Sequence, residues 1–229
     1  MLRSLVGSEM CIRDSSKTVN LVVTIEPVEG VKQHNHEAGV RMAGLRITDF
    51  IGRLAKDLEA DEWETFETLP ILEQVKQYPE LPKVVYVYML QTQGLLHDTY
   101  VYGVDAKKII PTFLYPTEIM DGAICSGNCV SACDKNPTYV HLNNGVIREL
   151  YKEHGKSINF LGVVITNENV YLMDKIRHSD MTAKLCEFLG ADAAIVSQEG
   201  FGNPDTDLIM NCKKTVSYTH LTLPTILLV

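Results

Sequence analysis

Phe160-Leu-Gly-Val-Val-Ile-Thr166 and Ala193-Ala-Ile-Val-Ser197 are the two stretches that decide the fold. Both are short, continuous apolar runs rich in β-branched residues, a pattern typical of strands buried on both faces. Tyr171–Leu189 lies between them and has the length and spacing of a helix. A strand, a helix and a strand in this order favour a parallel crossover. The sequence therefore predicts an α/β fold, a three-layer sandwich with a mainly parallel sheet. The inner face of the helix is predicted to hold Met181, Leu185, Phe188 and Leu189, with Cys186 in the core.

Further elements are predicted on the N-terminal side of these stretches. Val84–Leu90 is strongly strand-like, and Ile109–Tyr115 is expected to be a short or edge strand because it contains one proline and precedes another. Residues 59–83 are acidic and contain prolines, so we interpret them as a connector with one short strand or helix. The other predicted elements are a strand at Leu21–Ile25, an amphipathic helix at Val40–Leu58 and a helix at Gly145–Glu153.

The carboxyl ends of the predicted parallel strands are where a ligand is expected to bind. Three of these strands end at Gln91–Gly94, at Asn167-Glu168-Asn169 and at Glu199-Gly200. Glu168 and Glu199 are therefore candidate catalytic carboxylates. For each carboxylate the alternative is a helix N-cap or a solvated loop charge. The candidate hydrogen-bonding residues for a substrate are Asn167, Asn169 and Asn203.

Both ends of the chain resemble translated sequencing adaptors, at residues 4–15 and 216–225. Such segments are left out of fold reasoning. We expect residues 1–15 and 216–229 to be artefacts and residues 16–215 to be an internal fragment of the natural protein, made of one α/β domain.

Composition excludes several classes of protein. The formal net charge is −8, and no cluster of Lys and Arg is visible, which argues against nucleic acid as the main partner. No apolar run approaches the roughly 20 residues of a membrane helix, so no membrane partner is expected. Without the predicted adaptors, the cysteine count falls from six to an odd number. With no secretion signal, this fits the reducing cytoplasm better than a disulfide framework.

The segment from Asp121 to Asn136 reads Asp-Gly-Ala-Ile-Cys-Ser-Gly-Asn-Cys-Val-Ser-Ala-Cys-Asp-Lys-Asn, with Cys125, Cys129 and Cys133 four residues apart. A metal or iron–sulfur site is one interpretation. Gly127 and Asn128 are poor helix residues, and close cysteine pairs are absent, so we predict no metal. A second interpretation is three ordinary buried thiols.

A third interpretation of this segment is chemical. In a flexible turn, the Cys129 thiol can attack the carbonyl of Asn128 in an N-to-S acyl shift. Elimination then leaves a dehydroalanine, which becomes an imine, and hydrolysis of the imine leaves a pyruvoyl group. The reaction needs a strained or twisted backbone and a group that takes the Cα proton. The spacing of the cysteines does not decide among the three interpretations.

Four stretches of sequence favour the third interpretation of the cysteine segment. They are Tyr86–Asp105 (Tyr-Val-Tyr-Met-Leu-Gln-Thr-Gln-Gly-Leu-Leu-His-Asp-Thr-Tyr-Val-Tyr-Gly-Val-Asp), Ser126–Asn136, Val164–Tyr171 (Val-Ile-Thr-Asn-Glu-Asn-Val-Tyr) and Glu199–Asp207 (Glu-Gly-Phe-Gly-Asn-Pro-Asp-Thr-Asp). Together they resemble the large proprotein subunit of component B of glycine reductase, in a family that also serves sarcosine and betaine reductases. The resemblance covers essentially all of residues 16–215.

The resemblance implies self-cleavage between Asn128 and Cys129, after which two chains stay associated and the second begins with a pyruvoyl group made from Cys129. This cofactor captures the substrate amine as a Schiff base. The selenol of a small selenoprotein A then displaces the nitrogen, and component C converts the product to acetyl phosphate. A selenoprotein subunit of component B is a further implied partner. The predicted activity is that of an oxidoreductase of the glycine reductase type, a reductive deamination with a disulfide as acceptor. Glu168 and Glu199 are then candidates for the proton carrier.

Two alternatives remain open. One is a non-catalytic, uncleaved assembly subunit of the same complex. The other is a different pyruvoyl enzyme, such as a proline reductase-type subunit. Glycine and sarcosine are preferred as substrates over betaine, because a quaternary nitrogen cannot form an imine.

Overall fold

The computed structural model describes residues 21, 23–26, 28–59, 61–92, 99–126 and 136–219. The chain divides into two compact units, Met1–Trp63 and Glu64–Val229, and each is described by itself. In the described part of the chain, no helix combines the length and apolar character that a membrane crossing needs.

The first unit contains the helix α2, Gln33–Ala55. It starts earlier and ends earlier than the predicted helix at Val40–Leu58. The predicted strand at Leu21–Ile25 is wrong: the described residues of that stretch are not in a strand, and Leu21 is 67% exposed. A strand needs a partner for its backbone hydrogen bonds, and the described part of this unit contains no other strand.

The second unit is built on a four-stranded sheet in the order β4-β6-β1-β7. Its strands are β1 (Lys83–Leu90), β4 (Thr112–Leu114), β6 (Asn159–Asn167) and β7 (Ala193–Ser197). The three longer strands are parallel, whereas β4 pairs antiparallel with β6 at the edge. The prediction of an α/β fold with a mainly parallel sheet is confirmed, and so is the edge position of the strand near residue 113. Because β1 lies between β6 and β7, the predicted crossover passes over one strand.

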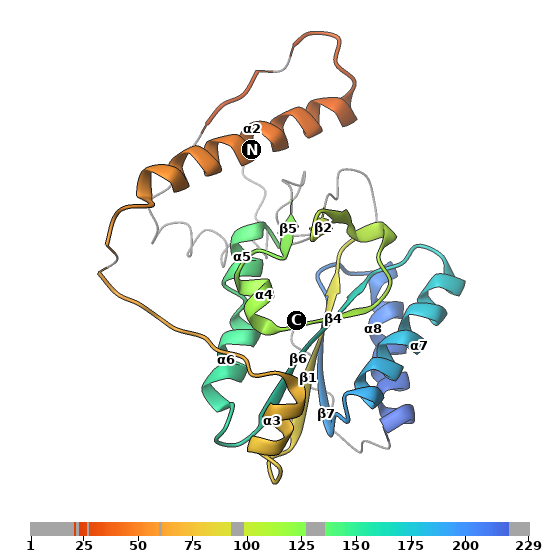
Figure 1. Ribbon diagram of the computed structural model, residues 1–229. Coiled ribbons are helices and arrows are strands. Elements are labelled where there is room, and N and C mark those ends of the chain that lie inside the picture. The colour runs from red at the N-terminus through yellow and green to blue at the C-terminus, as the bar shows by residue number, and fades with distance from the viewer. Residues whose placement is uncertain are drawn as a thin grey trace, which may run out of the picture. The chain divides into compact units, whose positions relative to one another are not determined.

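Side chains of β1 alternate between the two faces of this sheet, as the pleat requires. Tyr86, Tyr88 and Leu90 pack in one apolar cluster with Ile147 of α6 (Gly145–Glu153). Val85, Val87 and Met89 pack in the other, with Cys186 of α7 (Leu172–Phe188) and Leu208 of α8 (Asn203–Thr219). Figure 1 shows α7 and α8 on one side of the sheet and α6 on the other. Helices therefore cover both faces, as a three-layer sandwich requires.

Helix α7 differs from its prediction in one residue of the inner face. Cys186 is fully buried and Leu185 and Leu189 are partly buried, but Phe188 is 88% exposed. The buried residues of this helix are Lys175, His178, Ser179, Thr182, Ala183 and Cys186. This row follows the helical period of three and four residues and leaves Phe188 on the opposite side.

Smaller elements complete the second unit. The predicted connector contains α3 (Ile71–Gln77). A three-stranded antiparallel sheet has the order β3-β2-β5, with β2 at Thr99–Val101, β3 at Val104–Asp105 and β5 at Ile124–Ser126. Figure 1 shows β2 and β5 beyond the carboxyl end of β1. The remaining short helices are η1 (Ala106–Lys108), α4 (Pro116–Met120) and α5 (Thr138–Leu142).

Candidate functional site at the carboxyl edge of the main sheet

The carboxyl ends of β1, β6 and β7 meet at one edge of the main sheet, because Leu90 pairs with Asn167 and Tyr88 pairs with Ser197. The residues that follow these strands contact one another. The backbone N–H of Gln91 donates to Oε2 of Glu199 at 2.6 Å. Oε1 of Glu168 accepts from the backbone N–H of Glu199 at 3.0 Å. The structure thus brings the two predicted carboxylates together.

Glu168 is fully buried at this edge. Its Oε1 also accepts from the backbone N–H of Gly200 at 3.2 Å, whereas its Oε2 and Oε1 of Gln91 have no hydrogen-bond partner among the described residues. Burial raises the pKa of the Glu168 carboxyl from 4.5 to about 7, although the N–H donors of Gly200 and Glu199 lower it. A carboxyl with this pKa can both give and take a proton near neutrality.

Gly200 makes the close approach of these groups possible. A Cβ atom at this position would lie 2.8 Å from Oε2 of Glu168 and 2.8 Å from Oε1 of Gln91. No side chain fits there without displacing one of the two oxygen atoms. Any other residue at this point would therefore have to move the side chain of Glu168 or Gln91.

A second polar group, here named the tyrosine–histidine cluster, consists of Tyr88, Asn136, His141 and Glu199. The Tyr88 hydroxyl lies 2.8 Å from Nδ1 of His141 and accepts from the side-chain amide of Asn136 at 3.1 Å. Oε1 of Glu199 lies 3.6 Å from Nε2 of His141 and accepts from the backbone N–H of Asn136 at 3.3 Å. Burial in the core and the charge of Glu199 raise the pKa of Tyr88 well above its ordinary value, so its hydroxyl stays protonated.

The predicted cleavage site, Asn128-Cys129, lies outside the described residues. The residues on either side of residues 127–135 are described. The backbone N–H of Ser126 donates to Oγ1 of Thr138 at 2.9 Å, and that hydroxyl donates to the carbonyl of Ser126 at 3.1 Å. Two residues that bracket the predicted site are thus hydrogen-bonded to each other.

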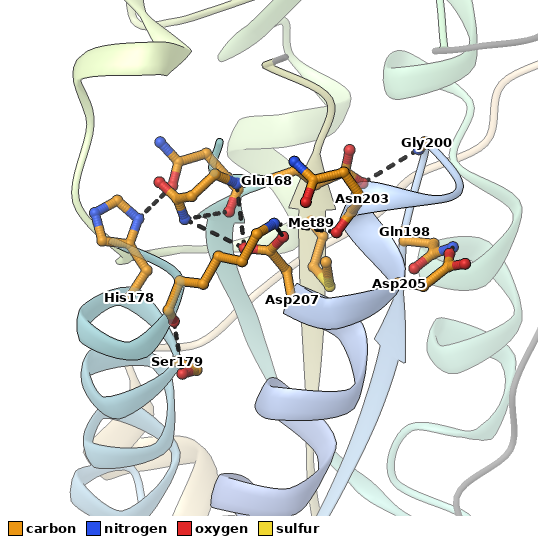
Figure 2. Close-up of polar contacts among 12 residues, drawn as sticks. Met89, Glu168, His178, Ser179, Gln198, Gly200, Asn203, Asp205 and Asp207 are labelled. Carbon is orange, nitrogen blue, oxygen red and sulfur yellow. Dashed lines mark hydrogen bonds and ion pairs between the residues drawn. The ribbon is translucent and has the colours of Figure 1, made fainter. Parts of the chain in front are cut away.

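A third group, here named the lysine–aspartate cluster, consists of Asn169, Lys175, Asn203 and Asp207. Figure 2 labels Asn203 and Asp207 of this cluster. Lys175 and Asp207 form an ion pair, with side chains 3% and 2% exposed. Lys175 also donates to the carbonyl of Asn203 at 3.1 Å, and the backbone N–H of Asn169 donates to Oδ1 of Asp207 at 3.1 Å. These contacts join α7 and α8 to the end of β6.

The three asparagines predicted to bind a substrate are placed differently. Asn167 is buried, and its side-chain amide donates to the carbonyl of Ala106 at 2.8 Å while its Oδ1 contacts Nδ1 of His178. Asn169 is partly buried in the lysine–aspartate cluster, and Asn203 is exposed. The structure brings Asn169 and the backbone of Asn203 together but does not bring all three amides to one point.

Several residues of this edge were not foreseen from the sequence: Tyr88, Asn136, His141, Lys175 and Asp207. One signal was available for Lys175. It shares a helical row with His178, Ser179 and Thr182, and a row of four polar residues on the buried side of a helix indicates buried polar contacts. The others depend on contacts between residues far apart in the chain.

In the described part of the chain, no group of three or more His, Cys, Asp and Glu residues is arranged to hold a metal ion. Cys125 is partly buried, and its Sγ lies 3.7 Å from the carbonyl of Gly122. Cys129 and Cys133, with which it was grouped in the sequence, lie outside the described residues.

Comparison with known proteins identifies the family. A family model described as "Glycine/sarcosine/betaine reductase component B subunits" matches residues 5–222. The chain is 69% identical over 199 residues to the glycine reductase complex component B subunits alpha and beta of Acetoanaerobium sticklandii, covering 87% of this chain and 46% of that protein. It is 62% identical over 199 residues to the sarcosine reductase complex component B subunit alpha of Peptoclostridium acidaminophilum, and this match also covers 87% of this chain and 46% of that protein.

A D-proline reductase proprotein of Acetoanaerobium sticklandii is 26% identical over 188 residues, which are 76% of this chain and 29% of that protein. No solved structure matches the chain. The chain spans about half the length of the first two relatives. It belongs to the family of glycine, sarcosine and betaine reductase component B subunits.

Proposed function

We propose that the full-length protein is the pyruvoyl-bearing subunit of glycine or sarcosine reductase, and that Cys129 is the precursor of the pyruvoyl group. The observation that carries this proposal is the 69% identity to a single sequence named for two subunits, alpha and beta, of glycine reductase component B. Because one sequence carries the names of two subunits, this relative supports a precursor chain that is cleaved into two chains. The segment Ser126-Gly-Asn-Cys129 supplies a cysteine suited to that division.

The proposed maturation consumes two water molecules. The Cys129 thiol attacks the carbonyl carbon of Asn128, the amide bond breaks, and the nitrogen becomes a free amine. Loss of the Cα proton and cleavage of the Cβ–S bond release the sulfur on the N-terminal chain, from which water frees it as hydrogen sulfide. The second water replaces the nitrogen, which leaves as ammonia, and the second chain then begins with a pyruvoyl group.

The described residues fit such a group in their chemistry. An α-carbonyl group of this kind supplies an electron sink that holds a substrate amine as a Schiff base. Proton transfer beside it needs a group that is neither fully charged nor fully neutral at pH 7. Glu168 meets this condition, since its pKa is about 7 and one of its oxygens has no hydrogen-bond partner among the described residues. Glu199 is the second candidate because it adjoins both Glu168 and Asn136.

We also propose roles for the other components of the reductase complex. A selenol of the small selenoprotein A attacks the α-carbon of the substrate and the amine leaves. The two electrons of this reductive deamination come from a dithiol, which becomes the disulfide that is the acceptor in the reverse reaction. Component C then forms acetyl phosphate. A selenoprotein subunit of component B is the stable partner, and the complex is placed in the cytoplasm. Higher identity to the glycine and sarcosine relatives, at 69% and 62%, than to a betaine reductase relative, at 40%, supports glycine or sarcosine as the substrate.

Reductive trapping tests the proposed Schiff base. Borohydride added to the full-length protein with glycine should attach the substrate covalently to the chain that begins at residue 129. Betaine should give no such adduct because its nitrogen has no hydrogen. The Cys129→Ala variant is the matched control and should trap neither compound. Trapping of glycine by Cys129→Ala to the wild-type extent would remove Cys129 from the proposal.

A separate test addresses the proton carrier. Glu168→Gln keeps the shape and the acceptor oxygen but cannot exchange a proton. We expect normal chain cleavage and a fall in turnover of about 10²–10⁴-fold, the usual contribution of a general acid or base. Turnover at the wild-type rate with normal cleavage would show that Glu168 does not carry the proton.

Two alternatives have distinct outcomes in the same experiments. An assembly subunit without catalysis would remain a single chain and trap no amine. A proline reductase-type subunit, an alternative that the relative at 26% identity supports, would be trapped by D-proline rather than by glycine.

A further inference from the structure

Asn136 is held from two directions by the tyrosine–histidine cluster. Its side-chain amide donates to the Tyr88 hydroxyl at 3.1 Å, and its backbone N–H donates to Oε1 of Glu199 at 3.3 Å. His141 joins these two partners, with Nδ1 2.8 Å from the Tyr88 hydroxyl and Nε2 3.6 Å from Glu199. The side chains of His141 and Glu199 are 0% exposed. Asn136 thus contacts a network that is fixed in the core.

The tyrosine–histidine cluster contains polar side chains in a part of the core that is otherwise apolar. Tyr88 is 1% exposed and belongs to the apolar cluster with Ile147 and Ile165. Buried polar groups are costly unless their hydrogen bonds are made, and a satisfied network fixes one geometry. The hydrogen bonds of this network hold Asn136, which is seven positions after Cys129 in the sequence.

Tyr86 provides an internal comparison. It lies two residues earlier on the same face of β1, is also 1% exposed, and its ring stacks on that of Tyr88 with centroids 5.2 Å apart. Its hydroxyl contacts Ser197 at 2.6 Å instead of Asn136. The two tyrosines therefore share burial and packing but differ in the hydroxyl contact.

We infer that Tyr88 and His141 are positioning residues for self-cleavage: by holding Asn136, they fix the chain that follows the Asn128–Cys129 bond. This inference rests on the proposed function. A second observation points the same way, since Ser126, three positions before Cys129, is hydrogen-bonded twice to Thr138. Described residues on both sides of residues 127–135, Ser126 and Asn136, are thus hydrogen-bonded to the rest of the fold. An acyl shift between adjacent residues depends on a fixed backbone geometry.

The test is a double-mutant cycle on the rate of cleavage in the full-length protein, followed by intact mass at intervals after synthesis. Tyr88→Phe and Asn136→Ala each remove the hydrogen bond between these residues, and each should slow cleavage about tenfold, the effect of one buried hydrogen bond. The double variant should be no slower than the slower single variant, because the shared bond is already lost. Tyr86→Phe should cleave at the wild-type rate. Thermal unfolding of every variant separates slow cleavage from failure to fold, and Asn136→Ala changes a half-buried loop residue rather than a core strand.

Each outcome has a distinct meaning. Equal cleavage rates in wild type, Tyr88→Phe and Asn136→Ala would overturn the inference and leave the proposed function intact. Slowing by Tyr86→Phe equal to that by Tyr88→Phe would also overturn it, since packing alone would then account for the effect. A wild-type protein that never cleaves would overturn the proposed function and the inference with it.

Discussion

The tyrosine–histidine cluster and the lysine–aspartate cluster occupy the same edge of one sheet but lie on opposite faces of it. The first adjoins the tyrosine-rich face under α6, and the second adjoins the aliphatic face under α7 and α8. In the lysine–aspartate cluster the side chains of Lys175 and Asp207 form a buried ion pair. In the tyrosine–histidine cluster the carboxylate of Glu199 faces an imidazole and a backbone N–H.

Because the two clusters differ in how their charges are paired, we expect them to have different roles. A buried ion pair with good geometry holds elements together and is very sensitive to loss of one partner. A network of hydroxyl, imidazole, amide and carboxylate groups is suited to orienting a chain and moving protons. We therefore propose that the lysine–aspartate cluster serves stability and that the tyrosine–histidine cluster serves the proposed self-cleavage. Glu168 lies between the two, and the charges of Asp207 and Lys175 both act on its pKa.

The largest expected effect is on the ion pair. Lys175→Met leaves the carboxylate of Asp207 buried without its cation and should lower the free energy of unfolding by about 3–5 kcal/mol. The matched control is Lys152→Met, which removes an exposed ion pair with Glu149 and should change stability by about 0–1 kcal/mol. Denaturant unfolding of the full-length protein measures both. Similar values for the two variants would break the assignment of the lysine–aspartate cluster to stability.

The next effect concerns Glu168 and pH. Between pH 4.5 and about 7 the native state holds the Glu168 proton and the unfolded state does not, so the free energy of unfolding falls as pH rises through this window. Glu168→Gln removes this dependence. From pH 4 to pH 8 the variant should therefore gain about 3 kcal/mol relative to wild type, since each pKa unit is worth about 1.4 kcal/mol.

Unfolding at several pH values measures this difference. Glu187→Gln, at an exposed position on α7, controls for the substitution itself. Parallel pH profiles for wild type and Glu168→Gln would mean that folding does not shift the pKa of the Glu168 carboxyl, which would then be charged near neutral pH. The proton carrier would then have to be sought in the tyrosine–histidine cluster.

A smaller effect is expected at the loop that joins the two clusters. Gly200→Ala forces a methyl group against the side chains of Glu168 and Gln91 and should cost about 1–3 kcal/mol. Gly145→Ala is the control, since a Cβ at the start of α6 would meet no atom within 4 Å. Thermal unfolding compares the two. An unchanged stability in Gly200→Ala would show that the loop tolerates displacement of these oxygens.

The sequence predicted the main sheet well because strands buried on both faces leave continuous apolar runs. Gly145–Glu153 and Ala193–Ser197 even have the predicted bounds. The same signal was misleading at Leu21–Ile25, since an apolar run does not specify a pairing partner. The meeting of Glu168 and Glu199 was predictable because parallel strands bring their carboxyl ends to one edge.

The rest of the site could not be predicted, because it depends on contacts across the fold. Lys175 and Asp207 are 32 residues apart and meet only through the packing of α7 against α8. Tyr88 and Asn136 are 48 residues apart, and nothing in a strand pattern distinguishes Tyr88 from Tyr86. The roles of Cys129 and Asn128, which lie outside the described residues, stay predictions.

The most direct test of the central claim is the intact mass of the full-length protein, produced anaerobically with its partner subunit, beside the Cys129→Ala variant. We predict two chains divided between Asn128 and Cys129, with the second blocked to N-terminal sequencing, and a single chain for Cys129→Ala. A single uncleaved chain for the wild type would contradict this prediction. The protein would then be an assembly subunit of the same family.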